Sequence, residues 1–148
     1  EQALVCADQE LFRAAVSPYV EARCGTLDCH GSMQRPMRIY GRNGLRHPDE
    51  LNISGGEPTT ELELAANYAS VCGLEPEKMS AAVDKLGASG DRLLFVAKPR
   101  ATIRHKGGKV VDEGDDADRC MLGWISQVGE RDAAEVAARC AAAAAKLR

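Results

Sequence analysis

The sequence predicts a mostly α-helical domain in which long loops connect the helices. Apolar residues recur at helical spacing in several segments, and the Ala-rich segment 130–147 has the composition of a strong helix former. Residues 31–58 instead carry Gly and Pro at short intervals, which favours a long loop. A chain of 148 residues has the usual length of one domain, so we expect residues 1–148 to form a single unit of four to five helices.

The first predicted helix covers residues 8–23. Asp8 can cap its first turn, and an apolar stripe runs from Leu11 to Val20. Pro18 lies inside this stripe and lacks a backbone N–H, so it should kink the helix or split it after Ser17. We expect this helix to pack against the C-terminal helices.

Capping residues and apolar spacing predict further helices. They cover residues from about 60 to 72, from Pro76 to near Gly87, and from Asp115 or Asp116 through Ile125. In the helix after Pro76, the side chains of Met79, Val83 and Leu86 should face inward. A short apolar stretch lies at 93–96, and residues 100–114 should form a loop or a short hairpin.

The composition disfavours several classes of protein. A net charge of −3 argues against nucleic acid as a partner. No segment approaches the roughly 20 apolar residues of a membrane-spanning helix. The chain begins at Glu1 rather than Met, as expected of a processed or trimmed protein.

Six cysteines are many for a protein of the reducing cytosol. Cys24 and Cys29 form a close pair, while the other four lie far apart, at positions Cys6, Cys72, Cys120 and Cys140. These four can form two disulfides in three connectivities. Disulfides indicate an oxidising compartment, so we expect an exported protein in the periplasm or outside the cell.

The segment Cys24-Gly-Thr-Leu-Asp-Cys29-His30 predicts covalent attachment of one c-type haem. Two thiols can form thioethers with the haem vinyl groups, and a His directly after the second Cys can ligate the iron. The usual spacing is C-x-x-C-H, and the wider spacing here is a rarer variant found in some multihaem cytochromes. The alternative is a tight-loop disulfide between Cys24 and Cys29, with His30 incidental. A zinc site is disfavoured because the segment lacks a second close ligand pair.

Five segments of the chain form an ordered set that spans roughly residues 12–125. They are residues 12–24 (FRAAVSPYVEARC), 35–45 (RPMRIYGRNGL), 90–99 (GDRLLFVAKP), 105–108 (HKGG) and 122–125 (LGWI). The set resembles bacterial cytochrome c-like domains, in particular the planctomycete type and its myxobacterial relatives. The Cys spacing departs from that family's usual C-x-x-C-H, and the other four cysteines are not part of its pattern. The resemblance implies a small cytochrome c-like helical domain with long loops around one haem.

The iron of a low-spin electron-transfer haem needs a second axial ligand opposite His30. His105 is the first choice, because the following Gly107-Gly108 lets the backbone approach a porphyrin closely. The resemblance also implies a His at this position. His105 can instead be a surface-loop residue, and the other candidate ligands are Met33, Met37 and Met121. An open distal position is a further alternative.

Two clusters of charge have a potential role. Arg35, Arg38, Arg42 and Arg46 follow the attachment segment, and Arg can bind the anionic haem propionates bidentately. We take Arg35 and Arg38 as the first candidates, against an ordinary solvated basic loop. The acidic cluster of Asp112, Glu113, Asp115, Asp116 and Asp118 is typical of a solvated face at a helix N-terminus, and it can also steer a basic redox partner.

These patterns predict single-electron transfer to and from a redox partner protein, so the domain should not be an enzyme. Two alternatives stay open. One is a haem-free, disulfide-stabilised scaffold or binding domain with the same fold. The other is a haem sensor or peroxidase with an open distal site.

Overall fold

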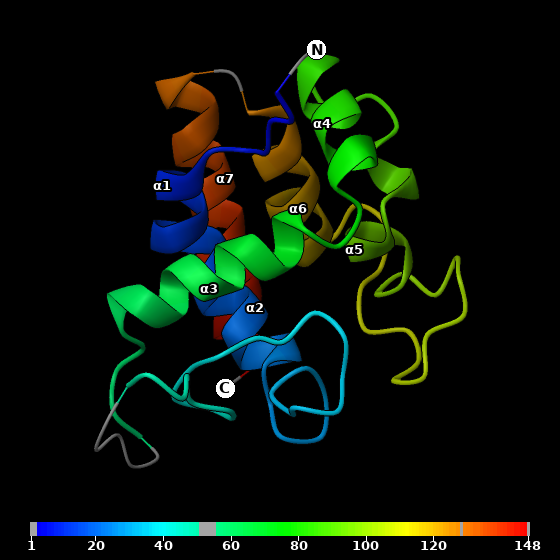
Figure 1. The fold of residues 1–148 in the computed structure, drawn as a ribbon. Coiled ribbons are helices and arrows are strands. Elements are labelled where there is room, and N and C mark those ends of the chain that lie inside the picture. Colours follow the sequence, from blue (N-terminus) through cyan, green and yellow to red (C-terminus); the bar gives the residue numbers. More distant parts are fainter. Residues whose placement is uncertain (1–2, 51–55, 128, 148) are drawn as a thin grey trace.

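The computed structural model describes residues 3–50, 56–127 and 129–147, and its secondary structure is helical (Figure 1). Its elements are α1 (Gln9–Leu11), the π-helix η1 (Phe12–Val16), α2 (Ser17–Cys24), α3 (Glu61–Cys72), α4 (Pro76–Asp84), the 3-10 helix η2 (Gly90–Arg92), α5 (Leu94–Ala97), α6 (Asp116–Ser126) and α7 (Glu130–Ala145). Because no strand occurs in these ranges, the prediction of a mostly α fold is confirmed. Residues 51–55 of the predicted long loop lie outside the described residues.

α1, η1 and α2 form one continuous helical rod with a change of winding in the middle. Asp8 caps it as predicted, since its Oδ1 accepts a hydrogen bond from the Leu11 N–H at 2.7 Å. The predicted split after Ser17 is wrong, because α2 begins at Ser17 and runs through Pro18; the irregular turn is the π-helical segment just before it. There the Ser17 N–H donates to the Phe12 carbonyl five residues back, so the register shifts where Pro18 supplies no donor.

This rod contacts both C-terminal helices, as predicted. α6 and α7 lie beside each other in Figure 1, and the disulfide Cys120–Cys140 joins them. α3 crosses the rod, and the disulfide Cys6–Cys72 ties the end of α3 to the N-terminal segment. The structure therefore selects one of the three connectivities.

The core is centred on aromatic side chains from distant parts of the sequence. The Trp124 ring lies 5.0 Å from Phe12 and 6.0 Å from Phe95, centroid to centroid, and Tyr68 lies 5.6 Å from Phe12. The Trp124 indole N–H donates to the Asp8 carbonyl at 2.8 Å. A buried Trp thus keeps its polar atom satisfied while it joins the rod to α6.

One further local prediction is wrong. α4 ends at Asp84, and Leu86 beyond it has a φ of 55° and a side chain 66% exposed, so it does not face inward. Residues 100–114 form a loop, which confirms the first of the two predicted forms, and bonds from the Val110 and Val111 N–H groups to the Pro99 carbonyl close it. Among the helices described here, none is long and apolar enough to cross a membrane.

Candidate functional site

The structure brings His30 and His105 together from two separate loops. Their ring centroids are 6.5 Å apart and their planes are within 10° of parallel. A metal–imidazole bond is about 2 Å long, so two imidazoles on opposite sides of one metal ion have centroids about 6 Å apart. The centroid spacing of this pair is therefore close to that of two imidazoles that ligate one ion.

Each imidazole is oriented by a backbone carbonyl of its own loop. His30 Nδ1 lies 2.8 Å from the Pro36 oxygen, and His105 Nδ1 lies 2.8 Å from the Gly108 oxygen. A carbonyl only accepts hydrogen bonds, so each Nδ1 carries the proton and each Nε2 of the neutral ring keeps its lone pair. Metal-ligating histidines are oriented in this way, with the second nitrogen donating to a carbonyl or carboxylate.

The pKa of His30 is lowered, chiefly because the ring is partly buried. The hydrogen bond to Pro36 opposes this effect, while His105 and the cations Arg35 and Lys98 add to it. A lowered pKa keeps the imidazole neutral at physiological pH. Neutral imidazole is the form that binds a metal.

Cys24 and Cys29 are free thiols, in contrast to the four cysteines in disulfides. Their loop is closed by a bond from the Cys29 N–H to the Thr26 carbonyl at 2.9 Å and from the His30 N–H to the Cys24 carbonyl at 2.8 Å. The structure does not contain the alternative disulfide between them. Burial raises the pKa of the Cys24 thiol to about 12, so this thiol is protonated at neutral pH.

Close backbone contacts shape the loop after α2. A Cβ on Gly31 would overlap the Gly25 carbonyl oxygen and lie 2.7 Å from the Thr26 oxygen. A Cβ on Gly44 would also overlap the Gly25 oxygen. The sequence indicates only that these glycines lie in a loop, whereas in the structure they let the backbone around residues 31 and 44 pack directly against Gly25.

The methionine candidates are placed less favourably than His105. Met121 is buried in the core, and Met33 is exposed. Met37 directly follows Pro36, whose carbonyl binds His30, so Met37 belongs to the same loop as His30. Only His105 among these candidates comes from a different loop and has its ring parallel to His30.

The four arginines after the attachment segment divide into two kinds. Arg38 donates to the Met33 carbonyl, and Arg35 lies close enough to His30 to influence its pKa. Arg42 instead donates to the Gly56 carbonyl, and Arg46 is committed to a buried ion pair. Of the four, Arg35 is therefore the one that acts on His30, while Arg38 is bound to a carbonyl of its own loop.

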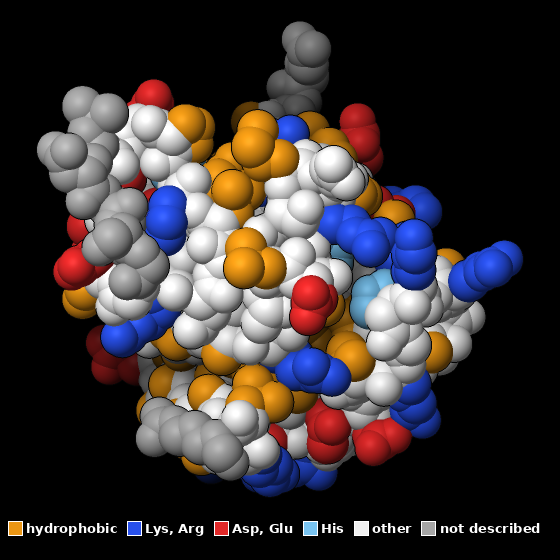
Figure 2. All heavy atoms as spheres, turned by 90° about the horizontal axis from the view of Figure 1, so that it is seen from below, with side chains coloured by type: hydrophobic (Ala, Val, Ile, Leu, Met, Phe, Trp, Pro, Cys, Tyr) orange, Lys and Arg blue, Asp and Glu red, His pale blue; other side chains and the backbone are white. Residues whose placement is uncertain are grey.

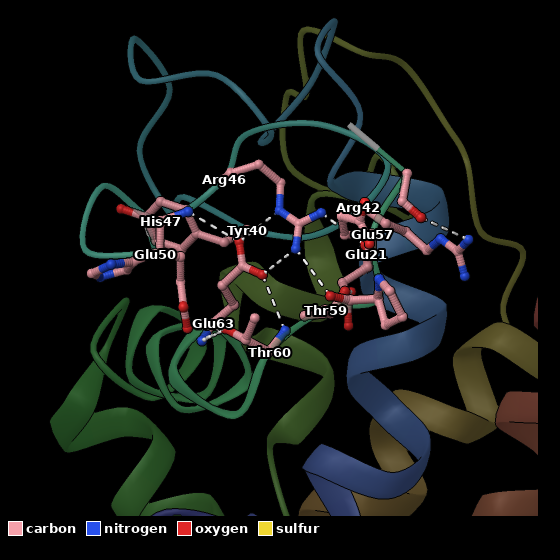
Figure 3. Close-up of polar contacts among 12 residues, drawn as sticks. Glu21, Tyr40, Arg42, Arg46, His47, Glu50, Glu57, Thr59, Thr60 and Glu63 are labelled. Carbon is pink, nitrogen blue, oxygen red and sulfur yellow. Dashed lines mark hydrogen bonds and ion pairs between the residues drawn. The ribbon is translucent and has the colours of Figure 1, made fainter. Parts of the chain in front are cut away.

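Arg46 anchors the long loop to the first turn of α3. It donates two hydrogen bonds to the fully buried Glu63, at 2.7 and 3.0 Å, and others to the Glu57 and Pro58 carbonyls (Figure 3). Glu63 also accepts from the His47 and Thr60 N–H groups and completes a capping box with Thr60. Burial would raise the pKa of Glu63, but these hydrogen bonds outweigh it and hold the pKa below its usual value.

The acidic cluster at 112–118 serves the fold. Asp115 caps α6, Asp116 pairs with Arg139 and Lys146, and Asp118 binds Arg100 through two 2.7 Å hydrogen bonds. Asp112 pairs with Lys109. The prediction of a solvated face holds for the exposed Asp112 and Glu113 but is wrong for Asp118, which is buried against Arg100, a partner that the sequence did not indicate.

Within the described ranges, no group of three or more His, Cys, Asp or Glu residues could hold a metal ion on its own. A haem iron does not require such a group, because the porphyrin supplies four ligands and the protein only the axial ones. Two imidazoles 6.5 Å apart, with two free thiols in the segment that leads to His30, are thus the kind of donors that a covalently attached haem would use. The chain matches no family model, no curated protein and no solved structure.

Proposed function

We propose that this domain holds one c-type haem and carries single electrons to and from a redox partner protein outside the cytoplasm. The observation that carries the proposal is the His30–His105 pair, with parallel rings 6.5 Å apart and each Nδ1 held by a backbone carbonyl. Two free thiols in the segment leading to His30 add to it. The two disulfides are compatible with an exported protein.

In this proposal each residue has one role. Cys24 and Cys29 bond covalently to the cofactor, His30 and His105 ligate the iron, and the guanidinium groups of Arg35 and Arg38 bind propionates. Exposed apolar side chains in the same loops are available to contact the porphyrin, namely Leu27, Met33 and Ile103. Haem when bound supplies reversible one-electron exchange, and the chain sets its potential through ligands, burial and hydrogen bonds.

A pyridine haemochrome assay of the purified exported protein tests covalent attachment. We expect a c-type spectrum that survives acid–acetone extraction in the natural protein and is lost in Cys24→Ala/Cys29→Ala. The matched control is Cys120→Ala/Cys140→Ala, which removes two other cysteines and should keep the haem. A protein without a Soret band would instead support the scaffold alternative.

Substitution of His105 tests the second ligand. His105→Ala should keep the covalent haem but convert its spectrum from low-spin to high-spin, because one axial ligand is lost. His105→Met should restore a low-spin spectrum with a higher reduction potential, since Met favours the reduced iron. His47→Ala, which alters the remaining His of this chain, is the control. A high-spin spectrum in the unsubstituted protein would favour the sensor or peroxidase alternative.

A further inference from the structure

We propose that the face around His30 and His105 docks an acidic surface of a protein partner. The proposal rests on the proposed function, because an electron carrier must bring its cofactor close to a second redox centre. The partner surface is proposed to be negatively charged, although this chain itself has a net charge of −3.

Charge is strongly segregated along the sequence. Residues 23–46 and 98–109 together hold ten of the 19 Lys and Arg residues but only one of the 22 Asp and Glu residues. These two segments therefore carry a formal charge of +9, and the rest of the chain carries −12. The net charge of −3 conceals this separation.

The two basic segments meet at the candidate site. One contains His30 and the other His105, and the two rings are 6.5 Å apart. Arg35 from the first segment and Lys98 from the second both act on the pKa of His30. Figure 2 shows Lys and Arg side chains bordering a hollow in which a histidine is visible.

Most of these cations are available to a partner. Arg46 and Arg100 are buried in ion pairs, and Lys109 pairs with Asp112. Five other cations of the two segments form no ion pair within the described part of the chain. They are Arg23, Arg35, Lys98, Arg104 and Lys106. The two propionates of one haem could offset two of these charges and would leave the rest.

Spread-out cations of this kind suit a broad anionic surface. A small anion is usually held by donors that converge on it, whereas these side chains come from two loops on either side of the histidine pair. Complementary charge across an interface speeds the encounter of two proteins and fixes their orientation. An acidic protein surface would therefore be steered to the place where the two imidazoles lie.

Two redox-inert ions of opposite charge can map this face by NMR, with or without haem. The paramagnetic trianion hexacyanochromate(III) should broaden amide signals of residues 23–46 and 98–109 in the reduced protein. The trication hexaamminechromium(III) should instead broaden signals elsewhere, for example at the start of α7. Broadening by the trianion outside the two segments, or none, would overturn the proposal. The haemochrome assay judges the proposed function separately.

Binding of poly-L-glutamate tests the acidic-protein assignment. Arg104→Gln/Lys106→Gln should weaken the affinity about tenfold, since each exposed ion contact contributes a few-fold. The control Lys85→Gln/Arg131→Gln causes the same change of net charge at exposed positions outside the two segments and should have little effect. Equal losses in both variants would show that only net charge matters. Binding to phosphatidylglycerol vesicles but not to poly-L-glutamate would also overturn the proposal.

Discussion

The loops that carry His30 and His105, within residues 23–46 and 98–109, are each anchored at one end by a buried ion pair. They differ in how closely the backbone packs around the histidine. In the first, Arg46 binds Glu63 in the first turn of α3, and in the second, Arg100 binds Asp118 in the first turn of α6. The backbone around His30 stacks closely through Gly31, whereas residues 101–109 are mostly exposed. The two buried ion pairs hold both loops in place, and so keep the imidazoles near each other. Only the loop of His30 is held by close backbone packing as well.

This difference assigns the two histidines unequal tasks. His30 sits where its own loop, the Cys24–Cys29 turn and the end of α2 meet, so it cannot move without them. His105 depends on one ring-to-carbonyl bond within its loop and a return bond from the Gly108 N–H. We therefore expect the His30 side to decide whether the site forms and the His105 side to tune it.

Breaking the anchors should have the largest effect on stability. Arg46→Met and Arg100→Met each leave a buried carboxylate without its cation, which typically costs about 3–5 kcal/mol of unfolding free energy. Arg46→Met should cost more, because Arg46 also satisfies the Glu57 and Pro58 carbonyls. Urea denaturation of the two variants measures the difference.

The control for the anchors is Arg139→Met, which removes two more exposed ion pairs, one with Glu135 in α7 and one with Asp116 in α6. Pairs near solvent are worth little, so its midpoint should lie close to that of the natural protein. Equal losses in all three variants would mean that the buried anchors do not set the stability of the loops.

The helices were predictable because the residues at which they begin are encoded locally. Asp8, Thr60 and Asp115 cap three of them through hydrogen bonds to residues three positions later, which a linear pattern reveals. Leu86 was misjudged because α4 ends two residues before it, and a left-handed backbone turns its side chain outward. A periodic pattern does not show where a helix stops.

The site was predictable only in part, for a physical reason. The Cys24–Cys29–His30 segment is contiguous, and His105 was proposed from a glycine pair and a resemblance. The anchors were not predicted, since the partners Arg46 and Glu63 are 17 residues apart and meet only through the tertiary fold. The capping-box spacing of Thr60 and Glu63 was a readable signal for the carboxylate, but no signal indicated which arginine it binds.

Replacing one glycine by alanine in each histidine loop compares their packing directly, with a smaller expected effect on stability. Gly31→Ala requires backbone to shift behind His30, and overpacking of this kind typically costs about 1–3 kcal/mol. Gly108→Ala meets no atom within 4 Å and suffers only the strain of its φ of +79°, about 1 kcal/mol. We expect Gly31→Ala also to lower the yield of covalently attached haem, while Gly108→Ala leaves it unchanged.

Gly114→Ala is the control that separates the cost of backbone strain from the cost of packing in the loop of His105. Gly114 has a similar φ of +85° and also meets nothing within 4 Å. Matching losses of stability for Gly108→Ala and Gly114→Ala would confirm that no packing acts in the loop of His105. A much larger loss at Gly108 would contradict the contrast between the two loops.

The smallest expected effect is a pH dependence confined to the first loop. Glu21 is buried beside Gly41 and accepts hydrogen bonds from the Ser17 and Thr59 hydroxyls. Burial raises its pKa, and the two hydroxyls and Arg46 offset only part of that rise. The folded protein thus holds this proton more tightly than the unfolded chain, so the unfolded chain releases it first as pH increases.

Stability from this group is consequently full below the ordinary carboxyl pKa of about 4.3 and declines as pH rises through the folded-state pKa. Glu21→Gln removes the titration, so its stability relative to the natural protein should increase over that interval and then level off. Urea midpoints from pH 4 upward measure the trend, with the exposed Glu77→Gln as a control that should show little of it. A constant difference across the range would mean that Glu21 is not buried as a carboxyl group, and that the first loop packs less closely than its glycines imply.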